Sequence, residues 1–170
     1  MTNDNPGMPE QASLPAKPVS ASAIHDQTMV VFPNDLNTLG TLFGGRVMEQ
    51  ADILAATVAK RHAGRSVVTL MIDSVRFLAS ARHGDTLVFK ASVNRTWTTS
   101  MEVGLKVFTE DFHTMQRKHI LSAYFTFVGV DDQLRPVEIN PVLPETADEK
   151  RRFSEADERR AVRLKKKQKN

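Results

Sequence analysis

The 170-residue sequence contains no cysteine. This absence excludes disulfides, thiolate metal sites and a cysteine nucleophile, and it is typical of proteins from a reducing compartment. No stretch approaches the roughly 20 consecutive apolar residues that cross a bilayer. We therefore expect a cytoplasmic protein that does not associate with a membrane.

Several catalytic motifs are also absent. The sequence has no GxSxG turn of a serine hydrolase, no GxxxxGK[ST] phosphate loop and no HExxH zinc motif. No helix-turn-helix segment is evident, so we expect no nucleic-acid partner. Metal-ligand spacing is also missing among the five histidines, and we expect neither a metal nor another cofactor. The histidines are His25, His62, His83, His113 and His119.

The length and composition predict one soluble domain with extensions. Hydrophobic residues make up 41% and charged residues 25%, which are ordinary values for a globular protein. Residues 1–23 contain four prolines and lack both a basic start and an apolar stretch, which predicts a disordered leader and not a signal peptide. The domain is expected over residues 24–132, followed over 133–170 by a proline-rich linker and a basic helix.

The C-terminal segment is strongly basic. Between Glu149 and Asn170 there are ten Lys and Arg against four Asp and Glu, a net charge of +6 in a chain whose total is +3. Thr146 and Glu149 have the spacing of a capping box, which predicts that a helix starts there. A solvated helix face is the more frequent explanation for such a charge, and binding of a polyphosphate is the alternative.

The hydrophobic pattern predicts an α+β fold. A helix over residues 46–62, ended by Gly64, is apolar around most of its circumference and is therefore expected to be buried. Alternating apolar residues predict strands on both sides of it. These strands are expected at 28–32, 67–79, 87–93, 101–107 and 120–130. The order predicts an antiparallel sheet that wraps around the helix.

Asp52 is the strongest catalytic candidate. It lies seven residues after Gly45, two turns inside the expected helix, where a buried carboxylate needs a partner or a purpose. A carboxylate in a cleft can take a proton from water as a general base. The alternatives are that Asp52 points to solvent or pairs with an arginine. Asp73 interrupts an apolar strand and is a second candidate acid, although a hydrogen-bonded structural role is favoured for it.

A glycine-rich loop precedes the helix. Gly44 and Gly45 lie where a helix N-terminus exposes unpaired amides, and such amides can hold an oxyanion. Asn37 upstream adds an amide side chain. The alternative is that the glycines only meet the conformational needs of a loop.

The segments that contain these residues resemble one family. They are NTLGTLFGGRVMEQAD (37–52), VVTLMIDSVRFL (67–78), GD (84–85), TSMEVGLKVF (99–108), AYFTFVGVD (123–131) and RPVEINPVLPETADEKRRF (135–153). Together they are similar to the hotdog-fold acyl-CoA thioesterases, which include bacterial acyl-CoA hydrolases and the brain-type and cytosolic enzymes. Two departures are Thr38, where many relatives have His, and Ala79-Ser80, where many have Pro.

The resemblance implies a five-stranded hotdog sheet around one long helix and the hydrolysis of fatty acyl-CoA. It further implies a homohexamer, arranged as a trimer of dimers, with active sites at the dimer interface. Asp52 would be the catalytic acid/base or nucleophile, Asn37 would face it from the partner protomer, and the Gly45 amide would polarise the thioester carbonyl. Coenzyme A would enter as part of the substrate.

The resemblance also implies a coenzyme A channel. Its lining residues would be Gly44, Leu70, Met71, Ile72, Thr99, Ser100 and Met101. The guanidinium groups of Arg159, Arg160 and Arg163 would meet the phosphates, which arginine recognises well. Two alternatives are a non-catalytic acyl-CoA sensor on the same fold and a hydratase, but no histidine lies at a useful spacing from Asp52 for the second.

Overall fold

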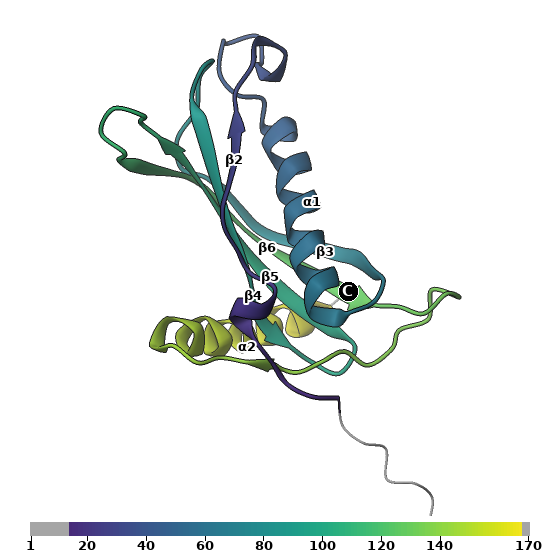
Figure 1. Ribbon diagram of the computed structural model, residues 1–170. Helices are drawn as coiled ribbons and strands as arrows, with labels where there is room; N and C mark the ends of the chain where they lie inside the picture. The colour runs from purple at the N-terminus through teal and green to yellow at the C-terminus, as the bar shows by residue number, and fades with distance from the viewer. Residues whose placement is uncertain (1–13, 168–170) are drawn as a thin grey trace, which may run out of the picture.

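Two helices lie on opposite faces of one sheet (Figure 1). The computed structural model describes residues 14–167. The main elements are β2 (Ile24–Val30), α1 (Gly44–Ala63), β3 (Val67–Phe77), β4 (Thr86–Thr96), β5 (Ser100–Glu110), β6 (Arg117–Gly129) and α2 (Ala147–Lys167). Short elements are β1 (Lys17–Pro18), β7 (Val142–Leu143) and the 3-10 turns η1 (Val19–Ala21) and η2 (Pro33–Asp35). The predicted α+β hotdog architecture is confirmed.

The five strands form an antiparallel sheet in the order β2-β4-β5-β6-β3. Strand β3, which follows the helix directly, pairs with β6 and not with the next strand in sequence. The chain therefore crosses the whole sheet between β3 and β4. The hydrophobic pattern predicted the strands but not this order, because pairing partners far apart in sequence leave no local signal.

Helix α1 packs its small residues against the inner face of the sheet. Ala51, Ala55 and Ala59 are fully buried, so the helix backbone approaches the phenylalanines of the strands closely. The expectation of burial on nearly all sides is wrong for one face, because Ile53 is 52% exposed. The helix ends where predicted, at Gly64, which adopts the left-handed conformation with φ of 64°.

The terminal segments pack onto the domain. The expectation of a disordered leader is wrong for residues 14–23, because β1 pairs in parallel with β7 and Lys17 Nζ donates to the His62 carbonyl at 2.7 Å. Residues 1–13 lie outside the described part of the chain. The capping box is confirmed, since the Glu149 amide donates to Thr146 Oγ1 at 3.2 Å and the Thr146 amide to Glu149 Oε2 at 3.0 Å.

The two edges of the sheet differ. Edge strand β2 exposes polar side chains such as His25, Asp26 and Gln27. Edge strand β3 exposes large apolar side chains, and a bare apolar edge is a template for pairing with another chain. The exposed apolar residues of β3 are Val68, Leu70, Met71, Ile72, Val75 and Phe77.

Candidate active site

Asp52 lies on α1 with its carboxylate partly exposed. Its Oδ1 accepts a hydrogen bond of 3.1 Å from the Thr69 hydroxyl on β3. No basic side chain between residues 14 and 165 forms an ion pair with it, so the structure does not support the alternative of an arginine partner. The carboxylate therefore combines access to solvent with one fixed hydrogen bond that orients it.

Thr69 was missed by the sequence analysis. It stands first in the run TLMI and looks like an ordinary residue of a β-branched strand. One signal was available: the strand expected at 67–79 had to pack against the helix expected at 46–62. Such packing can bring a hydroxyl of the strand near Asp52, the acid in the middle of the helix. The pairing of Thr69 with Asp52 became visible only with the register of β3.

The N-terminus of α1 offers two unpaired amides. Among the described residues the Gly44 and Gly45 amides donate no hydrogen bond, as expected for the first turn of a helix. Gly45 and Asp52 are seven residues apart, so their positions share a helix face at a separation of roughly 10 Å along the axis. The site therefore has unpaired donors at the helix start and a carboxylate two turns further on.

Asn37 organises its own loop. Its Oδ1 accepts from the amides of Leu39 at 2.9 Å and Thr41 at 3.2 Å, and its Nδ2 donates to Thr41 Oγ1 at 2.9 Å. No hydrogen bond joins Asn37 to Asp52 within the described part of one protomer. The structure thus gives Asn37 a rigid setting, and an approach to Asp52 from a partner protomer stays a prediction.

An ion pair between buried Asp35 and half-exposed Arg46 fixes both ends of this loop. Asp35 Oδ1 accepts from Arg46 Nε at 2.8 Å, and Asp35 Oδ2 accepts from the Phe32 amide at 2.9 Å. The Phe32 amide and the Arg46 guanidinium hold the pKa of Asp35 below its usual range. Asp35 therefore stays ionised at neutral pH and ties the Asn37 loop to the helix start. The sequence analysis did not single out Asp35.

An apolar cavity of about 380 Å³ adjoins the helix N-terminus. Its volume lies in the range of small-molecule sites. The Phe77 ring borders it and lies over Gly44, where a β-carbon would approach the ring to 3.2 Å. The other lining residues are Leu42, Val47, Leu78, Ala79, Ser80, Ala81, Ile120 and Leu121.

The residues predicted to line a coenzyme A channel are only partly accessible. Leu70, Met71 and Ile72 are exposed on β3, and Thr99 and Ser100 are half-buried at the turn before β5. The prediction is wrong for the side chain of Met101, which is fully buried in the core. It occupies an inward position of β5, opposite Phe127, and the alternation of the strand leaves it no route to solvent.

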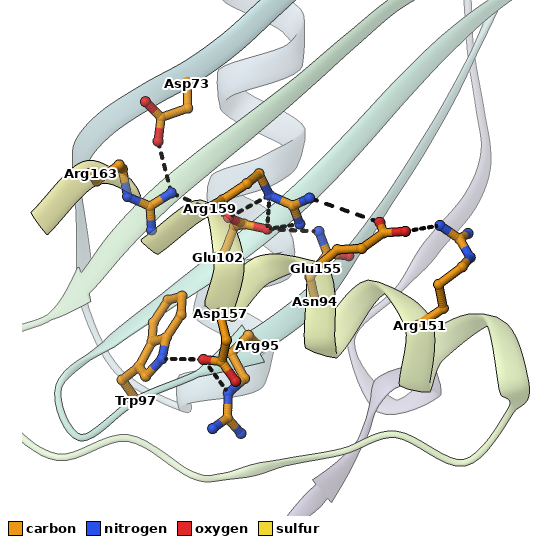
Figure 2. Close-up of polar contacts among 10 residues, drawn as sticks. All are labelled: Asp73, Asn94, Arg95, Trp97, Glu102, Arg151, Glu155, Asp157, Arg159 and Arg163. Carbon is orange, nitrogen blue, oxygen red and sulfur yellow. Dashed lines mark hydrogen bonds and ion pairs between the residues drawn. The ribbon is translucent and has the colours of Figure 1, made fainter. Parts of the chain in front are cut away.

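The three predicted phosphate-binding arginines differ in their partners, and Figure 2 shows those of Arg159 and Arg163. Arg159 Nη2 donates to buried Glu102 at 2.7 Å, and Arg163 Nη1 donates to Asp73 at 2.8 Å. Arg160 lies on the Trp97 ring at 4.3 Å and forms no ion pair among the described residues. Burial and neighbouring cations lower its pKa. Of these three arginines, Arg160 alone donates no hydrogen bond to the residues that the structure describes.

Asp73 has the structural role that the sequence analysis favoured, because Arg163 occupies its carboxylate. Between residues 14 and 167 no group of three or more His, Asp or Glu side chains is arranged to hold a metal ion. None of the helices in the same range has the length and hydropathy needed to cross a membrane.

Known proteins place the chain in a family. Residues 39–115 match the thioesterase superfamily. The chain is 39% identical over 123 residues to an uncharacterized acyl-CoA thioester hydrolase of Bacillus subtilis, covering 72% of each chain. It is 34% identical to the acetyl-coenzyme A thioesterase of Mus musculus over 81% of this chain, but it spans only 25% of that protein. The chain belongs to the thioesterase superfamily.

Solved structures agree. An apo-hexameric acyl-CoA thioesterase has a TM-score of 0.86 at 39% identity, over 90% of this chain and 97% of that one. The acyl-CoA hydrolase of Staphylococcus aureus, solved with butyryl coenzyme A and coenzyme A, has a TM-score of 0.83 at 36% identity, over 91% and 96%. Three variants of that hydrolase replace an Asn, an Asp and a Thr by Ala. The replaced positions are separated by 15 and 17 residues, and Asn37, Asp52 and Thr69 have the same separations here.

Proposed function

We propose that this protein is an acyl-CoA thioesterase that hydrolyses fatty acyl-CoA to a free fatty acid and coenzyme A. Membership of the thioesterase superfamily and similarity to proteins named as acyl-CoA hydrolases support the reaction class. The observation that carries the proposal for this chain is the Asp52 carboxylate, held by Thr69 two turns along α1 from the unpaired Gly44 and Gly45 amides. We also propose the cytoplasm as its location.

In the proposed reaction, Asp52 takes a proton from water and the hydroxide attacks the thioester carbon. The Gly45 amide donates to the oxyanion, where a preorganised donor stabilises the developing charge. The carbon–sulfur bond then breaks, and the proton held by Asp52 passes to the departing thiolate. Asn37 of the facing protomer would position the water or the substrate. Direct attack by Asp52, through an anhydride that water opens, uses the same residues.

The apolar cavity beside Gly44 suits the acyl chain, because it begins where the Gly45 amide would hold the carbonyl. The exposed apolar residues of β3 suit the pantetheine arm. Among the three arginines proposed for the phosphates, Arg160 is the best placed, because it has no carboxylate partner within the described residues and lies beside Trp97, before the Thr99–Ser100 turn.

We further propose that two protomers pair through β3 and that three such dimers form a hexamer. Solved relatives described as hexameric and the exposed apolar edge of β3 support this assembly. Pairing there would cover side chains such as Leu70, which is 64% exposed, and would bring the Asn37 loop of the partner protomer toward Asp52.

The substitution Leu70→Lys tests the pairing. A charge on the edge strand disfavours strand addition, so the variant should elute as a monomer in size-exclusion chromatography with light scattering and should lose thioesterase activity. Lys60→Ala, at an exposed position of α1, is the control and should keep both properties. A Leu70→Lys variant of unchanged mass and activity would contradict pairing through β3.

The substitution Asp52→Asn tests the function. Loss of a general base lowers kcat by about 10² to 10⁴. The assay follows thiol release from acyl-CoA substrates of increasing chain length, and circular dichroism checks the fold. Glu49→Gln is the matched control, because it removes an exposed carboxylate one turn earlier on the same helix, paired only with Arg46 among the described residues.

The outcomes separate the alternatives. Full activity of Asp52→Asn would refute the assigned base. A wild-type protein that binds acyl-CoA but releases no thiol would refute the enzyme and favour the sensor.

A further inference from the structure

Strand β3 carries Thr69 and Asp73, whose side chains face opposite sides of the sheet. Residues four apart in a regular strand share a face, because side chains alternate with a period of two. Thr69 lies opposite Phe127 and faces α1, whereas Asp73 lies opposite Tyr124 and faces α2. One extra residue between Thr69 and Met71 changes the alternation, as in a β-bulge. Because of the bulge, the side chains of Thr69 and Asp73 point to opposite faces of the sheet.

At the outer face Asp73 is tied to α2. Its Oδ2 accepts from Arg163 Nη1 at 2.8 Å, and the same nitrogen lies 3.4 Å from Glu102 Oε2 (Figure 2). Among the described residues this is the only hydrogen bond or ion pair between side chains of α2 and β3. Among the described residues, one polar side-chain contact therefore links the C-terminal helix to the strand that carries Thr69.

The position of Arg163 is itself fixed by a buried charge. Glu102 is 0% exposed and accepts from Arg159 Nη2 at 2.7 Å and from Asn94 Nδ2 at 3.1 Å. The Arg159 guanidinium also stacks on the Tyr124 ring at 3.8 Å. Because a buried carboxylate strongly requires its partners, α2 is held in one register over the sheet. Arg163 thus offers Asp73 a rigid anchor.

Strand β3 is irregular on both sides of Asp73. Within the protomer it pairs with β6, and in the proposed dimer it also pairs with β3 of the partner protomer. A second irregularity follows Asp73, before Arg76, and Ser74 adopts a positive φ of 51°. Residues 71–73 therefore form a short paired segment between two breaks in the ladder, next to Thr69. The contact between Asp73 and Arg163 fixes this segment relative to α2.

We propose that Asp73 and Arg163 are positioning residues for the thioesterase reaction. They hold the bulged segment of β3 so that the Thr69 hydroxyl meets the Asp52 carboxylate, and they touch no substrate. The C-terminal helix is then part of the support of the active site. This inference rests on the proposed function.

The substitution Asp73→Val tests the inference, since valine suits a strand and cannot accept a hydrogen bond. Because misplacement of a catalytic group by about 1 Å can cost as much as 10²-fold in rate, we expect kcat to fall about 10-fold with little change in KM. The loss should be the same for an acyl-CoA and for an acyl thioester of N-acetylcysteamine, which has no nucleotide. Arg163→Met should behave alike, while Arg163→Lys should recover part of the rate.

The matched control is Arg151→Met. Arg151 lies on the same helix and pairs with Asp148 and Glu155, without contact to β3. Its kcat should stay within twofold of the wild type. Thermal melting and size-exclusion chromatography verify that each variant is folded and assembled; if Asp73→Val does not fold, Arg163→Met decides the outcome, because Arg159 still pairs with Glu102 there.

A double-mutant cycle distinguishes positioning from general structural support. In a Thr69→Ala background, Asp73→Val should lower kcat by less than twofold, because the group that it positions is gone. Independent, multiplying losses would overturn the inference. A rise in KM for acyl-CoA alone would instead assign Arg163 to phosphate binding. If the wild type is active and Asp73→Val is fully active, the positioning inference is overturned and the proposed function stands. If the wild type is inactive, both the proposed function and the inference are overturned.

Discussion

The two faces of the sheet are joined to their helices by different forces. On the inner face, α1 buries alanines against phenylalanines, and its one central acid, Asp52, keeps a single side-chain hydrogen bond. On the outer face, α2 is held largely by ion pairs and stacked arginines around Glu102 (Figure 2). The apolar packing leaves the Asp52 carboxylate without an ion pair among the described residues, whereas Glu102 and Asp73 on the outer face are both paired with arginines. The reactive acid is therefore expected on the inner face.

The largest effect that would sharpen this comparison is expected from Glu102→Ala. Removal of one partner from a buried ion pair leaves uncompensated charges and typically costs about 3 to 5 kcal/mol. Urea unfolding followed by circular dichroism should show a loss of that size. Asp157→Asn, which alters the more exposed contacts to Arg95 and Trp97, should cost under about 1 kcal/mol. Equal losses would mean that packing, and not buried charge, holds α2.

A smaller effect is expected from acid at the inner side, where buried His62 lies in the last turn of α1. Its Nε2 lies 3.1 Å from the Asn140 carbonyl, so it donates there, and its buried Nδ1 has no partner among the described residues. Burial lowers the pKa of His62. Between this lowered pKa and the unfolded value of about 6.5, only the unfolded chain binds a proton, so stability falls as the pH drops below about 6.5.

Each unit by which the pKa is lowered contributes about 1.4 kcal/mol to this pH dependence. Urea midpoints at pH 7.5 and pH 5.5 measure it in the wild type. The variant His62→Gln should show a smaller difference between the two pH values, with His83→Gln as an exposed control. A wild-type midpoint that rises on acidification would show that His62 is charged in the folded protein.

The sequence predicted the parts of the fold that depend on local signals. Residues 44–63 form the predicted helix, the alternating segments form strands, and the Thr146–Glu149 box starts α2. The resemblance to the acyl-CoA thioesterases also gave the superfamily correctly. Asp52 could be singled out because an acid in an apolar helix is conspicuous in any arrangement.

The remaining errors come from contacts between distant residues. The leader looked disordered because its pairing partner β7 lies more than a hundred residues away. Met101 was assigned to the channel by the resemblance, whereas its place in the apolar alternation of residues 101–107 agrees with the buried position that the structure gives it. Arg159 and Arg163 looked free for phosphates, because their ion-pair partners Glu102 and Asp73 lie on strands far away in the sequence.

The sequence by itself determined the elements and the candidate base, because periodicity, caps and turns act over a few residues. Only the tertiary structure decided that β3 crosses to the far edge, that its bulge turns Thr69 toward Asp52 and Asp73 toward α2, and that buried Glu102 fixes the arginines. These features depend on strand register, and a register is set by the packing of all the strands together.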